Sequence, residues 1–104
     1  MDVNKKDWKL FVDCLPEWQE RYMEKLGKEY VELLLRPDKQ ASEKFWELEK
    51  TIKKDKKSPG VMLELRKSDM EYDIMRLLKD KVISMDDLSD FSDELRERVK
   101  SFAE

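Results

Sequence analysis

The chain has 104 residues, of which 39% are hydrophobic and 45% are charged, and its formal net charge is −3. A chain of this length buries about two-thirds of the surface that it exposes when unfolded, so we expect one domain, residues 1–104, without disulfides or metal. Two glycines and three prolines are too few for many strands and turns, and the near-neutral charge is typical neither of a nucleic-acid binder nor of an acidic DNA mimic.

The N-terminal third is expected to form two helices. Asn4 is a typical N-cap, and the apolar spacing after it predicts a short helix that ends near Leu15. Pro16 is expected to begin a second helix that lasts until Pro37, because a proline has no N–H to lose at the first helical position. Gly27 lies inside this helix beside its apolar stripe, where a close helix crossing would explain a residue that costs about 1 kcal/mol against alanine. The stripe recurs at three- and four-residue steps: Leu15, Trp18, Tyr22, Leu26, Tyr30, Leu33 and Leu34.

The middle of the chain predicts two more helices. The third begins at Asp38 or Ser42 and is ended by Ser58-Pro59-Gly60. Its apolar residues form a narrow seam with steps of four, three and four residues, typical of a coiled coil: Ala41, Phe45, Leu48 and Ile52. The fourth, from about Val61 to Asp80, has the widest apolar face and is predicted to be the central, most buried helix.

Two further helix starts are expected in the acidic C-terminal stretch. Ser84 with Asp87, and Ser92 with the acidic pair that follows it, have the spacing of N-terminal caps. Apolar residues then continue at helical steps: Leu88, Phe91, Leu95, Val99 and Phe102. The whole pattern predicts an all-α protein, a compact bundle of four to five helices.

Candidates for chemistry are weak. The chain has no histidine, which excludes Ser–His, Cys–His and histidine–metal centres. Cys14 follows Asp13 on an apolar helix side, whereas a reactive thiolate needs positive surroundings, so a packing role is favoured. Carboxylate pairs at helical spacing are typical of a highly charged surface: Glu43 with Glu47, and Asp69 with Asp73. We expect no enzyme activity, no metal or other cofactor, and no small-molecule ligand.

The single cysteine, Cys14, cannot form an internal disulfide and indicates a reducing compartment. The N-terminal stretch MDVNKKDWKLF lacks the apolar core of a signal peptide, and no run approaches the ~20 apolar residues of a membrane helix. These features predict a cytoplasmic protein that does not enter a membrane.

Two groups of residues are candidate contact sites. Seven basic and three acidic residues give residues 49–67 a net charge of +4, and four basic and eight acidic residues give residues 80–104 a net charge of −4. The basic candidates for nucleic-acid contact are Lys50, Lys53, Lys54, Lys56, Lys57, Arg66 and Lys67. A simpler interpretation of the lysines is a solvated helix end that complements the helix dipole. The aromatic candidates for a protein interface are Trp8, Trp18 and Trp46, although each of them also fits a bulky core.

The blocks EKFWELEKTIKKDKKSPGV and SMDDLSDFSDELRERV resemble short, soluble, all-helical proteins of Gram-positive bacteria that have no established function. The resemblance spans about residues 5–100 and implies no functional residue. From the residues themselves we expect a helical protein that acts through protein–protein contacts, with a homodimer as one form. The alternative is a nucleic-acid-associated regulator that uses the basic segment 50–67.

Overall fold

The computed structural model describes residues 4–103, which are helical and contain no strand. The predicted all-α class is confirmed for this part of the chain. Four α-helices are joined by turns and by three short 3₁₀ helices at Lys67–Asp69, Met85–Leu88 and Lys100–Ala103. The α-helices are α1 (Lys5–Leu34), α2 (Ala41–Asp55), α3 (Met70–Lys79) and α4 (Asp93–Val99).

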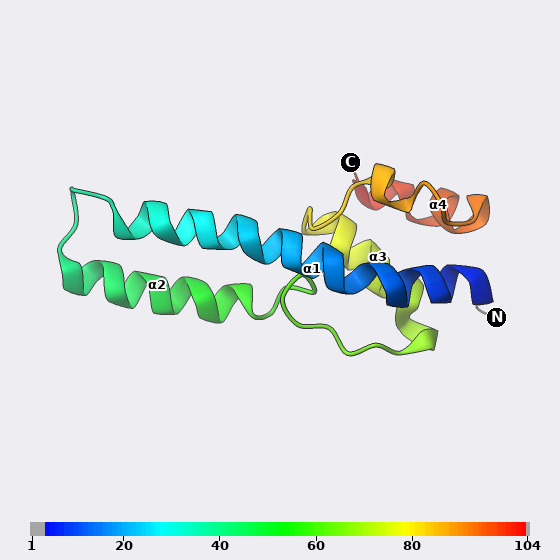
Figure 1. Cartoon of the computed structure of the whole chain (residues 1–104), viewed down its shortest axis with the longest axis horizontal. Helices are drawn as coiled ribbons and strands as arrows, with labels where there is room; N and C mark the ends of the chain where they lie inside the picture. The colour runs from blue at the N-terminus through cyan, green and yellow to red at the C-terminus, as the bar shows by residue number, and fades with distance from the viewer. Residues whose placement is uncertain (1–3, 104) are drawn as a thin grey trace.

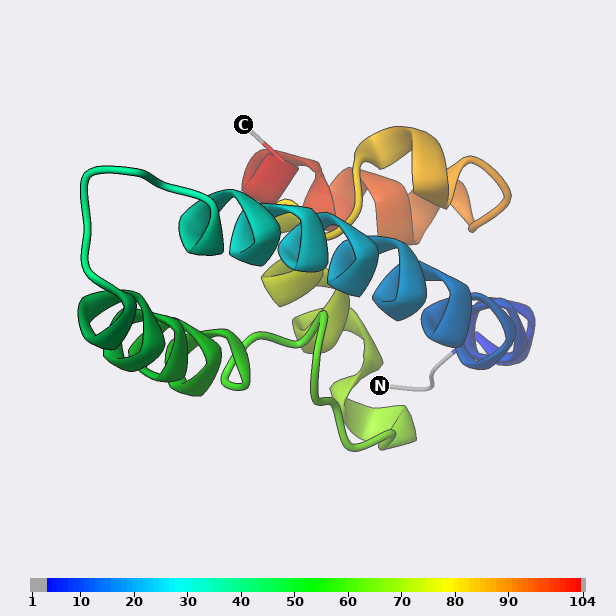
Figure 2. The same ribbon diagram turned by 60° about the vertical axis from the view of Figure 1, so that its left-hand side comes forward.

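The predicted boundary at Pro16 is wrong, because α1 is one helix of 30 residues with Pro16 inside it. Asn4 caps it as expected, with its side-chain oxygen accepting the N–H groups of Lys6 and Asp7. Pro16 is exposed, while Leu15 and Trp18 on either side of it are buried against the rest of the protein. Packing on both sides of the proline therefore holds the helix together, although the first turns run in a different direction from the rest (Figure 2).

The core lies around the N-terminal half of α1. We call the part of the molecule that contains it, residues 4–22 and 58–103, the body. At its aromatic centre, Trp18 packs between Phe11 and Phe91 with tilted rings. The ring centroid of Trp18 lies 6.2 Å from that of Phe11 and 6.1 Å from that of Phe91. The other buried apolar residues come mainly from α3, α4 and the turns between them: Leu15, Met70, Ile74, Leu77, Leu78, Val82, Ile83, Leu88, Leu95 and Val99. α3 is thus the most buried of the later helices, as predicted.

The prediction is wrong for the first third of the fourth helix. Residues 61–66 are not helical, and α3 begins only at Met70 after a 3₁₀ turn. Leu63 packs against the core and Val61 is half-buried, whereas Met62 and Glu64 are exposed. Such alternation is the pattern of an extended segment, which carries the chain from the end of α2 along the body to the start of α3 (Figure 2).

Both predicted C-terminal caps are confirmed. Ser84 and Asp87 form a capping box, in which the Ser84 N–H donates to Asp87 Oδ2 over 2.8 Å. Ser92 Oγ accepts the N–H of Leu95 at the start of α4. These local bonds start the short and the final helix where the sequence pattern expects them.

The second half of α1 and the whole of α2 extend away from the body as an antiparallel helical pair, which we call the arm, residues 23–57 (Figure 1). The molecule is therefore 53 Å long and only 23 Å by 20 Å across. Its radius of gyration is 16.4 Å, whereas a compact chain of this length has about 13 Å.

The arm has almost no core of its own. Leu26 is the only residue of segment 23–57 that is buried, and α2 has no buried residue. Leu48 and Ile52 of the predicted seam are half-buried, but Phe45 is 62% exposed. A side chain added at Gly27 would meet no atom within 4 Å, so the expected close helix crossing at this glycine is wrong.

Candidate interaction surface on the arm

An exposed row of apolar residues runs along the arm segment of α1. Met23, Gly27, Val31 and Leu34 follow each other at steps of four, four and three residues. This spacing keeps them on one side of a helix with 3.6 residues per turn. Met23 is 45% exposed, Val31 54% and Leu34 46%. The row therefore presents apolar side chains to solvent rather than to α2 or the body.

Two aromatic residues on α2 are equally exposed. Phe45 and Trp46 are 62% and 63% exposed, and their rings pack edge to face with centroids 5.0 Å apart. The pair lies in the second turn of α2, close to the tip of the arm. We found no other described helix with two neighbouring aromatic residues so exposed.

The row on α1 and the aromatic pair on α2 lie on the same face of the arm. Leu26 on α1 and Leu48 on α2 lie on the sides where the two helices meet. On each helix, a turn about the helix axis in the direction of increasing residue number leads from the inward residue to the exposed apolar residues. In an antiparallel pair of helices, the same sense of rotation leads to the same face. We call this face, formed by Met23, Gly27, Val31, Leu34, Phe45 and Trp46, the apolar face of the arm.

The body does not cover the apolar face. Phe11, Leu15 and Trp18, which bind α1 to the body, lie on the opposite side of α1 from the row through Gly27. Glu32 lies on that other side of the arm and is exposed. The apolar face of the arm is thus open to solvent, and the opposite side carries exposed charged residues such as Glu32.

Hydrogen bonds hold the arm's two helices in register. Lys44 Nζ donates to the carbonyl oxygen of Leu34 over 3.0 Å near the tip, and the Tyr30 hydroxyl donates to the Asp55 carboxylate near the base. Burial and the Asp55 carboxylate raise the pKa of Tyr30. These contacts place Trp46 near the level of Leu34 along the arm.

The arm is fixed to the body through the buried turn Ser58-Pro59-Gly60. Gln19 Nε2 donates to the carbonyl oxygen of Pro59 over 3.0 Å, and Ser58 Oγ donates to Asp80 Oδ2 over 3.2 Å. Pro59 is fully buried. The direction in which the arm projects is therefore set by packed contacts and not by a free linker.

The predicted tryptophan surface does not form. Trp18 is 4% exposed and lies in the core, because its side of α1 faces Phe91 and not solvent. Trp8 is half-buried and packs beside Phe11, with ring centroids 6.1 Å apart. Of the three tryptophans only Trp46 lies on an open surface. Sequence reasoning missed Phe45, Val31 and Leu34 as its neighbours, although the row of Gly27 with Met23 and Val31 was visible in the helical spacing.

The lysines of the basic segment are solvated. Lys50, Lys53, Lys54, Lys56 and Lys57 are all exposed at the base of the arm. Within residues 4–103, Lys53 is the only one of them with an ion pair, to Glu49 at 2.8 Å. None of the five pairs with an acid of the C-terminal segment that the structure describes, so the two oppositely charged segments do not neutralise each other within the chain.

The other two basic candidates lie farther along the chain. Arg66 ends the extended segment and pairs with Glu64 at 3.1 Å, and Lys67 is exposed in the following 3₁₀ helix. The structure therefore distributes the seven basic candidates over α2, the turn that follows it, the extended segment and the 3₁₀ helix at Lys67–Asp69.

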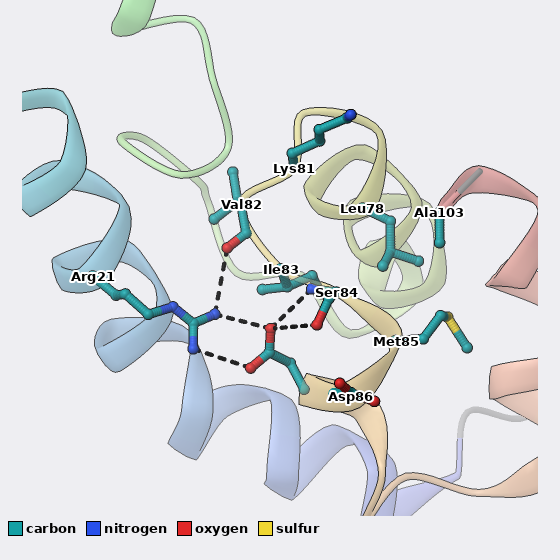
Figure 3. A pocket seen from close by; sticks show the side chains of 10 residues that line it. Arg21, Leu78, Lys81, Val82, Ile83, Ser84, Met85, Asp86 and Ala103 are labelled. Atoms are coloured by element: carbon teal, nitrogen blue, oxygen red, sulfur yellow. Dashed lines mark hydrogen bonds and ion pairs between the residues drawn. The ribbon is translucent and has the colours of Figure 1, made fainter. Parts of the chain in front are cut away.

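A surface depression with a volume of about 730 Å³ lies where α1 passes the turn after α3 (Figure 3). Arg21 donates to both oxygens of Asp87, over 3.0 Å and 2.9 Å, and to the Val82 carbonyl oxygen. Burial opposes the ionisation of Asp87, but the bonds from Arg21 and from the Ser84 N–H outweigh it and lower the pKa of Asp87. Arg21, Asp87 and Ser84 are thus engaged with each other, and these bonds join α1 to the C-terminal part of the body.

Cys14 and the acidic residues were candidates for chemistry in the sequence. Burial, with Glu17 and Asp13 nearby, raises the pKa of the Cys14 thiol, which makes a thiolate less available. Among residues 4–103 no group of three histidine, cysteine or acidic residues is placed to hold a metal ion. None of the described helices is long and apolar enough to cross a membrane.

One buried carboxylate is poorly satisfied. Asp73 is 5% exposed, its Oδ2 has no hydrogen-bond partner in the described chain, and the nearest cation is Arg76, 3.9 Å from Oδ1. Burial and the charge of Asp69 raise the pKa of Asp73. A raised pKa means that the folded chain binds the proton of Asp73 more tightly than the unfolded chain does. The charge of Asp73 therefore destabilises the folded state at neutral pH.

Replacing Asp73 with asparagine is expected to raise the free energy of unfolding at pH 7 by about 1 kcal/mol, because an unpaired buried charge is removed. The advantage should disappear below about pH 3.8, where Asp73 is protonated in both the folded and the unfolded chain, and should grow as the pH rises through the folded pKa. Urea unfolding of both proteins across this range measures it. Asp90→Asn, at an exposed position, is the control; a constant difference at all pH values would contradict the assignment.

No protein-family model, no curated protein and no solved structure matches this chain. The resemblance to small Gram-positive proteins therefore stays a prediction. The candidate surface is defined by the geometry of the arm alone.

Proposed function

We propose that the chain is a small, non-enzymatic helical protein that acts through protein–protein contacts made by the apolar face of its arm. The observation that carries this proposal is the exposure of Phe45 and Trp46 on a helix with no buried residue. The protein works without a cofactor in the cytoplasm, where its single thiol, Cys14, stays reduced.

The physical chemistry of the arm supports a partner. Isolated helices shorter than about 12–15 residues are marginal in water, and most helices in proteins are stabilised by packing of an apolar face. α2 has 15 residues and receives only partial cover from α1. Trp, Phe and Met are enriched at the centres of protein interfaces, and contiguous apolar surface of this kind typically marks a binding site. A partner on the apolar face would supply the packing that the arm lacks.

The nucleic-acid alternative receives less support. Lysines that contact phosphates are placed along one side of an element, without acids among them. Lys53 of α2 is paired with Glu49, Asp55 lies among the candidate lysines, and Arg66 is paired with Glu64. Cations in a last helical turn also complement the helix dipole without any ligand.

Site-specific photo-crosslinking in cells tests the contact surface. A benzophenone amino acid at the position of Trp46 should give covalent adducts with protein, whereas the same group at Glu32, on the opposite side of the arm, should give few. The adducts are measured by gel mobility and mass. Equal labelling from both positions, or adducts from neither, would overturn the proposal; adducts to nucleic acid from position 46 would favour the alternative.

A further inference from the structure

We infer that the partner on the apolar face is a second copy of this chain, with two arms packed face to face and pointing the same way. In this arrangement α1 of each copy lies over α2 of the other, and the two arms form a four-helix bundle. The inference rests on the proposed function and adds the identity of the partner and the geometry of the contact.

The apolar residues of the arm are complementary to each other under this two-fold symmetry. Near the tip, Val31 and Leu34 on α1 lie at about the level of Phe45 and Trp46 on α2, as the bond from Lys44 to the Leu34 carbonyl indicates. A two-fold axis along the arm keeps the level and exchanges the helices. The aliphatic side chains of each copy then cover the aromatic rings of the other, which produces a self-complementary interface.

The charged residues at the base of the arm are also complementary under this two-fold symmetry. On the side of the apolar face, α1 carries Glu20 and Glu24, and α2 with its C-cap residue carries Lys53 and Lys56 at about the same level. All four side chains are exposed, and of them only Lys53 forms an ion pair within the described chain. Exchange of the helices places the acids of one copy opposite the lysines of the other.

The opposite arrangement, with arms pointing in opposite directions, lacks this match. It would place α1 over α1 and α2 over α2, so that Trp46 of one copy would meet the lysines at the base of the other. The acids of α1 would then meet Val31 and Leu34. Charge complementarity therefore selects the parallel arrangement.

The size of the face sets the expected affinity. An arm helix of 15 residues is about 22 Å long. Two packed helices are about 20 Å wide, so the face offers on the order of 450 Å² per copy, at the small end of specific interfaces. The body lies on the other side of α1 and leaves room for the second arm. Association is expected at micromolar concentrations, with dissociation of the dimer on dilution.

Light scattering of the purified full chain across a concentration series tests the inference. The mass should rise from monomer to dimer, and Trp46→Glu should raise the dissociation constant at least tenfold. Glu32→Gln, on the opposite side of the arm, is the matched control and should leave it unchanged. Because these positions are exposed, circular dichroism of each variant should match the parent.

A charge exchange tests the parallel geometry. Glu24→Lys and Lys56→Glu should each weaken the dimer several-fold, and the double variant should restore it, because each reversed pair again meets its opposite across the interface. A dimer that Trp46→Glu disrupts, but that the double charge variant does not restore above the single charge variants, would overturn the parallel arrangement. A monomer at every concentration would overturn self-association. The proposed function would then survive only if position 46 crosslinks to a protein of different mass.

Discussion

Replacing Asp7 with alanine is expected to lower the free energy of unfolding by about 3 kcal/mol, because it removes two hydrogen bonds from a buried carboxylate. Asp7 is 2% exposed, and its two oxygens accept the Ser92 N–H over 2.8 Å and the Ser92 hydroxyl over 2.6 Å. The same hydroxyl oxygen caps α4 by accepting the Leu95 N–H. Asp7 thus joins the first turn of α1 to the start of α4, at a separation of 85 residues in the chain.

Urea unfolding, followed by circular dichroism, measures this effect. Asp7→Asn keeps one acceptor oxygen and should lose about half as much free energy, while Asp13→Ala, at an exposed position of the same helix, should change it by less than about 0.5 kcal/mol. A loss under about 1 kcal/mol for Asp7→Ala would mean that water replaces the carboxylate at no great cost.

Replacing Gly60 with alanine is expected to lower the free energy of unfolding by about 2–3 kcal/mol, through overpacking. A side-chain carbon at Gly60 would lie 2.4 Å from Tyr22 Cδ2 and 2.8 Å from Val82 Cγ2. Gly60 does not have a positive φ, so the requirement for glycine comes from this close approach and not from the backbone conformation. The buried turn would have to move away from α1, and the arm with it.

The other glycine is the matched control. Gly27→Ala meets no atom within 4 Å and should raise the free energy of unfolding by about 0.5–1 kcal/mol, because alanine is the better helix former. Both variants are compared by thermal or urea unfolding of dilute protein. Equal effects at the two positions would contradict the packing described for Gly60.

The candidate surface was only partly predictable. The spacing of Ala41, Phe45, Leu48 and Ile52 indicates one apolar side of a helix, and this side has the same period whether it packs in a core or faces a partner. Trp18 and Phe45 both belong to the apolar stripe of their helix, yet one is in the core and the other is exposed. Which of them is covered depends on the helices and turns that pack against it, and the sequence of a single helix does not specify those.

The sequence by itself determined the local features of this protein. Helical residues, the caps at Asn4, Ser84 and Ser92, and the helix end before Ser58-Pro59-Gly60 depend on bonds between residues a few positions apart.

Only the tertiary structure decided the rest. It decided that α1 continues through Pro16, because buried neighbours on both sides hold the helix, and that residues 61–66 are extended along the body. It also decided that the arm projects with an open apolar face. These outcomes depend on contacts between segments far apart in the chain, where packing outweighs local preference by several kcal/mol in sum.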